Sequence, residues 1–411
     1  MPTTSSARRT SSSAALLALA VLAAAARADV LHVPKDFPTV AEALAAAQAG
    51  DEIVLAAGSY NTPILIDDVD GIVLRGQGKV VLGGGTDVTP ALTLENSDHV
   101  TVDHLRIEGA QGTAVFAGPG ADDLVLSRLR IEDCAGTGIV AGESSGVLID
   151  RCRVEGAGGH GISILEAGEF TLSRCTVVDA GGIGIDVGDA QFITVDRCHV
   201  TGSGQSGIAM GFSGPSHHGV LSRNVVIDAG TNGLFVRGAE NVVTENRVQG
   251  AGGAGVLLHA ESVGGIVEDN TLVDAGVGLD VGGTGLLVRD NRVVTPVLEG
   301  IIVRQDLCVV GDDRVTKPGG DGYLLEATVD GGALLGCKAQ HAGDDGFEIA
   351  CSALSITGNS SLGADADGFE VLGDFNVLAA NSAHGSGVLD LEVLGAQSIL
   401  LANDVGTSNL P

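Results

Sequence analysis

The chain has 411 residues, of which 52 are acidic and 22 are basic, so its formal net charge is −30. Such an acidic chain repels the phosphates of nucleic acids, and we therefore expect no nucleic-acid partner. Aromatic residues make up 3% of the chain and tryptophan is absent, which counts against tight stacking of sugars on aromatic side chains.

Residues 1–28 have the features of a signal peptide. A basic start is followed by an apolar run too short to span a membrane and by a small-residue cleavage site that ends at Ala28. Removal of three arginines leaves 19 basic residues, so the mature net charge is 19 − 52 = −33. We expect residues 29–411 to form one domain without a transmembrane segment, and the protein to be secreted, periplasmic or on the cell surface.

The first predicted element of the mature chain is a capping helix over residues 39–50. Thr39 and Glu42 have the spacing of a capping box, and Gly50 follows an alanine-rich stretch as a helix-ending glycine. Such a helix can cover the open end of a repeat structure, where strand edges would otherwise be exposed.

A repeat of about 22 residues follows the helix. A glycine followed by an apolar residue, here called the repeat glycine, recurs from Gly138 to Gly368 at steps of 22 to 26 residues. The first and third residues after it are apolar, as in Ile162 and Ile164, while the second varies, which is the alternation of a half-buried strand. Short strands at this period predict an all-β fold, a single-stranded right-handed parallel β-helix solenoid with roughly 14 coils from residue 92 onward.

A second track of small polar residues keeps the same period. Its members are Cys152, Cys175, Cys198, Asn224, Asn246, Asn270, Asn291, Cys337, Asn359, Asn381 and Asn403. Asparagine tolerates the left-handed conformation of tight turns, and stacked amides hydrogen-bond as a ladder, so we interpret this track as structural. The seven cysteines are an odd number, and disulfides between adjacent coils stay open.

The repeat and the entry segment "TVAEALAAAQAGDEIVLAAGSY" resemble the pectin-lyase-like superfamily over residues 30–411. The resemblance implies the β-helix fold and leaves function open, because such folds include polysaccharide lyases, hydrolases, epimerases, tailspikes and non-catalytic proteins. The entry segment also looks like that of NosD-type maturation proteins, which implies an accessory role as one alternative.

One motif resembles a catalytic signature. "GGHGISI" contains His160 and is similar to the Gly-His-Gly motif of polygalacturonases, but the acidic pair expected one coil earlier is missing, and we interpret His160 as a surface turn residue.

The C-terminal third concentrates carboxylates. The residue before the repeat glycine is acidic in four successive coils, from Glu299 to Asp367, and Asp344 adds to this group. Carboxylates about 5 Å apart repel each other by roughly 3 kcal/mol at an effective dielectric constant near 20, so the group favours a hard cation such as Ca²⁺. The candidate metal ligands are Asp321, Asp344, Asp345, Glu348, Asp367 and Glu370.

The stretch "GDGYLLEATVDGGALLGCKAQHAGDDGFEIA" is similar to the calcium site of a β-helical pectate lyase family, with Glu348 in place of the last aspartate. The resemblance implies proton abstraction by a basic residue, but the family's downstream lysine is missing here. The candidate substitutes are Lys317, Lys338 and His341.

Three functions follow from these observations. The first is an exported β-helix protein that is non-catalytic or carbohydrate-associated and carries a calcium site. The alternatives are a calcium-dependent uronate lyase, acting by β-elimination, and a NosD-like periplasmic accessory protein. A polysaccharide is the partner class that the sequence leaves open, and whether the protein is an enzyme stays open as well.

Overall fold

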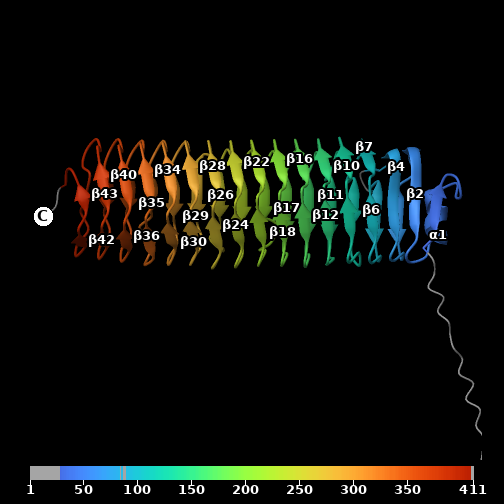
Figure 1. The fold of residues 1–411 in the computed structure, drawn as a ribbon, viewed down its shortest axis with the longest axis horizontal. Coiled ribbons are helices and arrows are strands. Elements are labelled where there is room, and N and C mark those ends of the chain that lie inside the picture. The colour runs from blue at the N-terminus through green and yellow to red at the C-terminus, as the bar shows by residue number, and fades with distance from the viewer. Residues whose placement is uncertain (1–27, 84, 87–88, 409–411) are drawn as a thin grey trace, which may run out of the picture.

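The computed structural model describes residues 28–83, 85–86 and 89–408, so residues 1–27 of the expected signal peptide lie outside the described residues. Short strands stack into a right-handed parallel β-helix of about 16 coils, with the helix α1 at its N-terminal end (Figure 1). The predicted fold class is therefore confirmed. No helix in the described ranges has the length and apolarity needed to cross a membrane.

Each full coil contributes three strands, one to each of three parallel stacks. The first stack is a 15-stranded sheet. Its strands are β3 (Ile64–Asp67), β5 (Leu92–Glu95), β8 (Val115–Ala117), β11 (Ile139–Gly142), β14 (Ile162–Leu165), β17 (Ile185–Gly188), β20 (Ile208–Met210), β23 (Leu234–Val236), β26 (Ala254–Leu258), β29 (Val277–Val281), β32 (Ile301–Val303), β35 (Tyr323–Leu325), β38 (Phe347–Ile349), β41 (Phe369–Val371) and β44 (Glu392–Val393). Fourteen of these strands begin at or after Leu92, as the sequence period predicts.

The other two stacks belong to one 31-stranded sheet, because the long strands β2 and β4 near the N-terminus join them. The joining strands are β2 (Glu52–Tyr60) and β4 (Val73–Leu82), and β1 (Val30–Val33) pairs with the start of β2. The second stack contains β6 (Thr101–Asp103), β9 (Val125–Ser127), β12 (Leu148–Asp150), β15 (Thr171–Ser173), β18 (Thr194–Asp196), β21 (Val220–Ser222), β24 (Val242–Thr244), β27 (Ile266–Glu268), β30 (Leu287–Arg289), β33 (Val309–Gly311), β36 (Ala333–Leu335), β39 (Ser355–Thr357), β42 (Val377–Ala379) and β45 (Ile399–Leu401). The third stack contains β7 (Arg106–Glu108), β10 (Arg130–Glu132), β13 (Arg153–Glu155), β16 (Thr176–Val178), β19 (His199–Thr201), β22 (Val225–Ile227), β25 (Arg247–Gln249), β28 (Thr271–Val273), β31 (Arg292–Val294), β34 (Arg314–Thr316), β37 (Lys338–Gln340), β40 (Ser360–Leu362), β43 (Ser382–His384) and β46 (Asp404–Val405).

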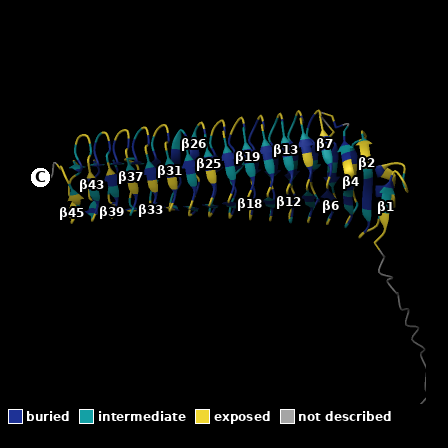
Figure 2. Ribbon diagram, turned by 45° about the horizontal axis from the view of Figure 1, so that its top comes forward, coloured by how far each residue is buried: buried dark blue, intermediate teal, exposed yellow. Residues whose placement is uncertain are grey.

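The apolar residues that alternate along the strands fill the interior, which forms one continuous core along the solenoid. Buried residues accordingly recur in coil after coil (Figure 2). The repeat glycines are required by this packing. A Cβ atom on Gly161 would lie 2.3 Å from the Val177 side chain and 2.5 Å from the Gly184 carbonyl oxygen, so no larger residue fits between successive coils. In the C-terminal coils, Tyr323, Phe347 and Phe369 stack with ring centroids 4.6 and 4.5 Å apart.

The asparagine track forms the expected ladder. The Oδ1 atom of Asn246 accepts hydrogen bonds from the backbone N–H of Asn224 at 2.9 Å and from its Nδ2 at 3.0 Å, and Asn246 Nδ2 donates to the Leu221 carbonyl at 2.8 Å. This arrangement pairs buried amides that would otherwise each cost free energy. All seven cysteines lie within the described residues and are buried and free, so no disulfide joins the coils.

The capping helix begins where the sequence predicts but is shorter. Helix α1 (Val40–Ala46) starts after Thr39, and both hydrogen bonds of the capping box with Glu42 are present at 3.2 Å. The helix ends before Gly50 because Ala47 is extended and the Asp51 carboxylate accepts the Gln48 N–H at 2.8 Å, which directs the chain into β2.

Candidate cation site

The aspartates before the repeat glycines form a ladder of their own. Asp321, Asp345 and Asp367 are 6 to 7% exposed and precede β35, β38 and β41. Asp321 Oδ1 accepts the backbone N–H of Asp345 at 3.0 Å, Asp345 Oδ1 that of Asp367 at 2.6 Å, and Asp367 Oδ1 that of Leu389 at 2.6 Å. One oxygen of each carboxylate therefore joins two coils, and the other remains for another contact.

In earlier coils, other side chains at the position before the repeat glycine accept the same hydrogen bond from the backbone of the next coil. The Nδ1 atom of His160 accepts the Ile183 N–H at 3.0 Å, and Asn232 Oδ1 accepts the Ala254 N–H at 3.0 Å. His160 is half-buried in its turn, and this bond to the backbone gives it a structural role. Because a neutral acceptor suffices for the bond, the charge of the three aspartates requires a separate explanation.

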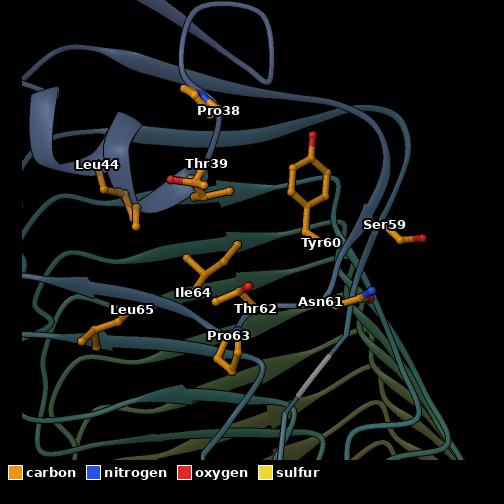
Figure 3. Close-up of a pocket in the computed structure, with 12 residues that line it drawn as sticks. Pro38, Thr39, Leu44, Ser59, Tyr60, Asn61, Thr62, Pro63, Ile64 and Leu65 are labelled. Atoms are coloured by element: carbon orange, nitrogen blue, oxygen red, sulfur yellow. The ribbon is translucent and has the colours of Figure 1, made fainter.

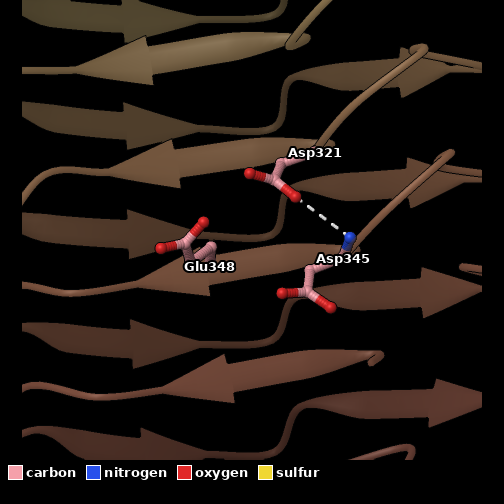
Figure 4. A group of neighbouring side chains, drawn as sticks. All are labelled: Asp321, Asp345 and Glu348. Carbon is pink, nitrogen blue, oxygen red and sulfur yellow. Dashed lines mark hydrogen bonds between the residues drawn. The ribbon is translucent and has the colours of Figure 1, made fainter. Parts of the chain in front are cut away.

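Glu348 completes the first carboxylate cluster. It lies on the outer face of β38, beside Asp321 and Asp345 (Figure 4). One carboxylate oxygen from each of these three residues lies within 4.8 Å of the other two. We call Asp321, Asp345 and Glu348 the first cluster.

Burial changes the acidity of the first cluster. It raises the pKa of Asp321 and of Asp345 to about 7 in each case, and the Glu348 carboxylate adds to the rise at Asp321. The pKa of Glu348 is raised as well, also mainly by burial. Such a site holds a proton near neutral pH, or exchanges it for a cation that supplies the missing positive charge.

No basic side chain in the described part of the chain supplies that charge. Within the described residues, the first cluster forms no ion pair. The guanidinium of Arg304, two coils before β38, is occupied by Asp280 at 2.7 Å and by Glu326. The negative charge of the cluster is therefore uncompensated by the side chains that the structure describes.

A second cluster follows one coil later. Carboxylate oxygens of Asp367, Glu370 and Glu392 lie within 4.8 Å of one another. Glu392 was not among the predicted residues, because Asp390 replaces the repeat glycine in its coil. Its signal was nevertheless present, since Glu392 pairs in register with Glu370 and keeps the period of 22.

The other predicted residues lie outside both clusters. Asp344 is exposed in its turn. Lys317 and His341 stack on adjacent coils as predicted, each in the turn that leaves the third stack of strands, and both are exposed. Lys338 is exposed at the start of β37, in a different stack from Glu348.

A cavity of about 570 Å³ lies at the other end of the molecule, between α1 and the first coil (Figure 3). Leu44, Pro63, Ile64 and Leu65 give it apolar walls, and the Tyr60 hydroxyl is engaged with the Ala56 carbonyl at 2.9 Å. Among the described residues no carboxylate or imidazole lines it, so it offers no second candidate for cation chemistry.

Comparison with known proteins identifies the family. A family model described as "Right handed beta helix region" matches residues 68–217 and 232–384. No curated protein matches the chain.

Among solved structures, pectate lyase Pel9A is 12% identical with a TM-score of 0.48, over 57% of this chain and 77% of that one. An alginate lyase from Paenibacillus sp. str. FPU-7 is 17% identical with a TM-score of 0.42, over 74% and 99%. PfbA, a surface adhesin of Streptococcus pneumoniae, is 12% identical with a TM-score of 0.41, over 91% of each chain. These likenesses carry no argument about activity.

Proposed function

We propose that this chain, which belongs to the right-handed β-helix family, is an exported and carbohydrate-associated protein whose C-terminal coils bind a divalent cation, with Ca²⁺ as the first candidate. The observation that carries the proposal is the first cluster. Three carboxylates lie within 4.8 Å of one another, two of them are more than nine-tenths buried, and no basic side chain in the described part of the chain pairs with them.

Calcium suits this arrangement because it binds six to eight oxygen ligands at about 2.3–2.6 Å and accepts irregular geometry. The ladder fixes Asp321 and Asp345 through one oxygen each, so little side-chain freedom is lost when the other oxygen binds an ion. An acidic β-helix repels an acidic polysaccharide, and a bound cation can bridge the two. The proposed carbohydrate association rests on this bridging.

Isothermal calorimetry with CaCl₂ on residues 29–411 tests the cation site. We expect saturable binding in the parent protein and its loss in Asp345→Asn/Glu348→Gln, where the new amide oxygen at position 345 still accepts the ladder hydrogen bond. Asp344→Asn is the matched control, since this neighbouring carboxylate lies outside both clusters, and it should leave binding unchanged. Absence of saturable binding in the parent protein would contradict the proposal.

A calcium-dependent uronate lyase is the second candidate function. A cation in the first cluster would neutralise a uronate carboxylate and acidify the α proton, which a base must then remove. The stacked Lys317 and His341 favour this candidate, because they lie in the turns that lead into β35 and β38. A rise in ultraviolet absorbance from an unsaturated product, lost in Lys317→Met, would support it; no absorbance change with uronate polymers in the presence of Ca²⁺ would exclude it.

A further inference from the structure

One corner of the solenoid carries a reversal of charge. A single residue in the left-handed conformation follows each strand of the second stack and turns the chain into the third, and we call this set the turn column. It is arginine in five successive coils and acidic in the next four. The basic members are Arg128, Arg151, Arg174, Arg197 and Arg223, and the acidic members are Glu245, Asp269, Asp290 and Asp312.

The members of the turn column lie directly above one another. The strands before them are in register from coil to coil, as Asp196 pairs with Ser222 and Ser222 with Thr244. The spacing along the column is therefore that of neighbouring strands, about 4.8 Å. The five arginine side chains are 45 to 56% exposed, and the four acidic residues are exposed.

Nearly buried aspartates form ion pairs with the arginines of the basic half. The Asp150 carboxylate pairs with Arg151 at 3.2 Å and with Arg174 at 2.6 Å. The Asp196 carboxylate pairs in the same way with Arg197 at 3.0 Å and with Arg223 at 2.7 Å. One nearly buried carboxylate thus serves two guanidinium groups, so the exposed rim of this half stays positively charged.

The acidic half of the column differs in its ion pairing. Within the described residues, none of its four carboxylates forms an ion pair. Arg289, which ends β30 directly before Asp290, pairs with Glu268 at 2.6 Å. Arg292 and Arg314 stand two residues beyond members of the column, at the start of β31 and β34, on the adjoining strand stack rather than on the corner.

The fold does not require charge at this corner. In later coils Gly336 and Gly358 occupy the turn column, and glycine adopts the left-handed conformation without steric cost. Arginine is uncommon in that conformation, yet it occurs here in five consecutive coils. The repeated use of a less suitable residue points to a role for its charge.

We infer that the turn column is the contact surface of an antiparallel homodimer. A two-fold axis perpendicular to the solenoid, placed between the coils of Arg223 and Glu245, would bring the basic half of one copy against the acidic half of the other. Equal coil spacing keeps four pairs in register: Arg223 with Glu245, Arg197 with Asp269, Arg174 with Asp290 and Arg151 with Asp312, each formed twice.

A second copy fits this surface better than a linear polyanion does. The arginines would attract a polyanion, but the four carboxylates that continue the same corner would repel it. Only a partner whose charge reverses at the same spacing complements both halves, and a copy of this chain in the opposite direction has that property.

Sedimentation velocity at about 0.15 M salt tests the inference, because charges further apart than about 8 Å are then screened while contacting charges still attract. We expect a dimer that dissociates at about 1 M salt. Arg151→Glu/Arg174→Glu/Arg197→Glu makes the column predominantly acidic, and Asp269→Lys/Asp290→Lys/Asp312→Lys makes it predominantly basic. Each variant alone should self-associate at least tenfold more weakly, and an equimolar mixture should form a heterodimer.

A folding check and a matched control variant accompany this experiment. Circular dichroism checks that the arginine variant is folded. The lysine variant removes no ion pair of the described structure, so at least one of the two variants is expected to be folded. The matched control, Asp133→Lys/Asp179→Lys/Asp228→Lys, makes the same charge change at left-handed turns that leave the third stack, and it should still dimerise. A monomeric parent protein, a dimeric lysine variant, or salt-sensitive binding of monomers to heparin through the arginines would overturn the inference.

Discussion

The substitution Asp313→Asn should stabilise the protein, and increasingly so as the pH rises. Asp313 occupies one rung of the asparagine ladder and is 0% exposed. Its Oδ1 accepts from the N–H of Asn291 at 2.6 Å and from Asn291 Nδ2 at 2.9 Å, as an asparagine would, but its Oδ2 has no hydrogen-bond partner among the described residues. An amide at this position could donate to the Val288 carbonyl, which is in register with the Val267 carbonyl that accepts from Asn291.

The magnitude follows from the acidity of the buried group. Burial raises the pKa of Asp313 from 3.8 to about 7. Between these values the unfolded chain releases this proton and the folded chain retains it, so the acid lowers the free energy of unfolding progressively as the pH rises. At about 1.4 kcal/mol per pH unit the loss is about 2 kcal/mol at pH 5 and about 4 kcal/mol above pH 7.

Urea unfolding at pH 5 and at pH 8 measures this effect. Asp313→Asn should increase the free energy of unfolding at both values, with a larger gain at pH 8. Asp312→Asn makes the same chemical change at the exposed neighbouring residue and should have little effect. A gain that is absent at pH 8, or independent of pH, would refute the proposed acidity and the equivalence of Asp313 to the asparagine rungs.

Three other substitutions test the structural elements. Asn246→Ala leaves buried backbone groups unpaired and should lower the free energy of unfolding by about 1–3 kcal/mol, measured by urea denaturation. Phe347→Ala should cost about 3–5 kcal/mol, because it opens a cavity between the stacked rings of Tyr323 and Phe369, whereas Phe347→Leu should cost less in the same assay. Thr39→Ala removes the capping box and should lower the stability of the N-terminal end by about 1 kcal/mol, seen as faster amide exchange in α1.

Much of the fold was predictable because each coil repeats the same physical constraints. The repeat glycine marks a close approach between coils, the residues at one and three positions beyond it enter the core, and the asparagine track marks a turn that needs a paired amide. Asp313 was not predicted as a rung, because an acid is not expected in a buried ladder. Gly50 suggested too long a helix, because the hydrogen bonds of Asp51 that redirect the chain are not visible as a sequence pattern.

The candidate site was predictable only in part. The spacing placed Asp321, Asp345 and Glu348 on one face, but it could not separate Asp344, whose side chain lies in the same turn and is exposed. Adjacent residues in a turn can point in different directions, and the sequence alone does not say which of them enters the ladder. Glu392 was missed for the opposite reason, because its coil keeps the period but lacks the glycine that marked the others.

The nearest-neighbour construction of the solenoid also determines how it would respond to force. A coil contacts only the coils on either side, so tension applied along the axis would meet the same set of hydrogen bonds repeatedly. Each released coil of about 22 residues would lengthen the chain by up to about 75 Å, at roughly 3.4 Å per residue. The molecule would then extend in even steps and lose its coils one after another, which allows a long rod to absorb work without failing all at once.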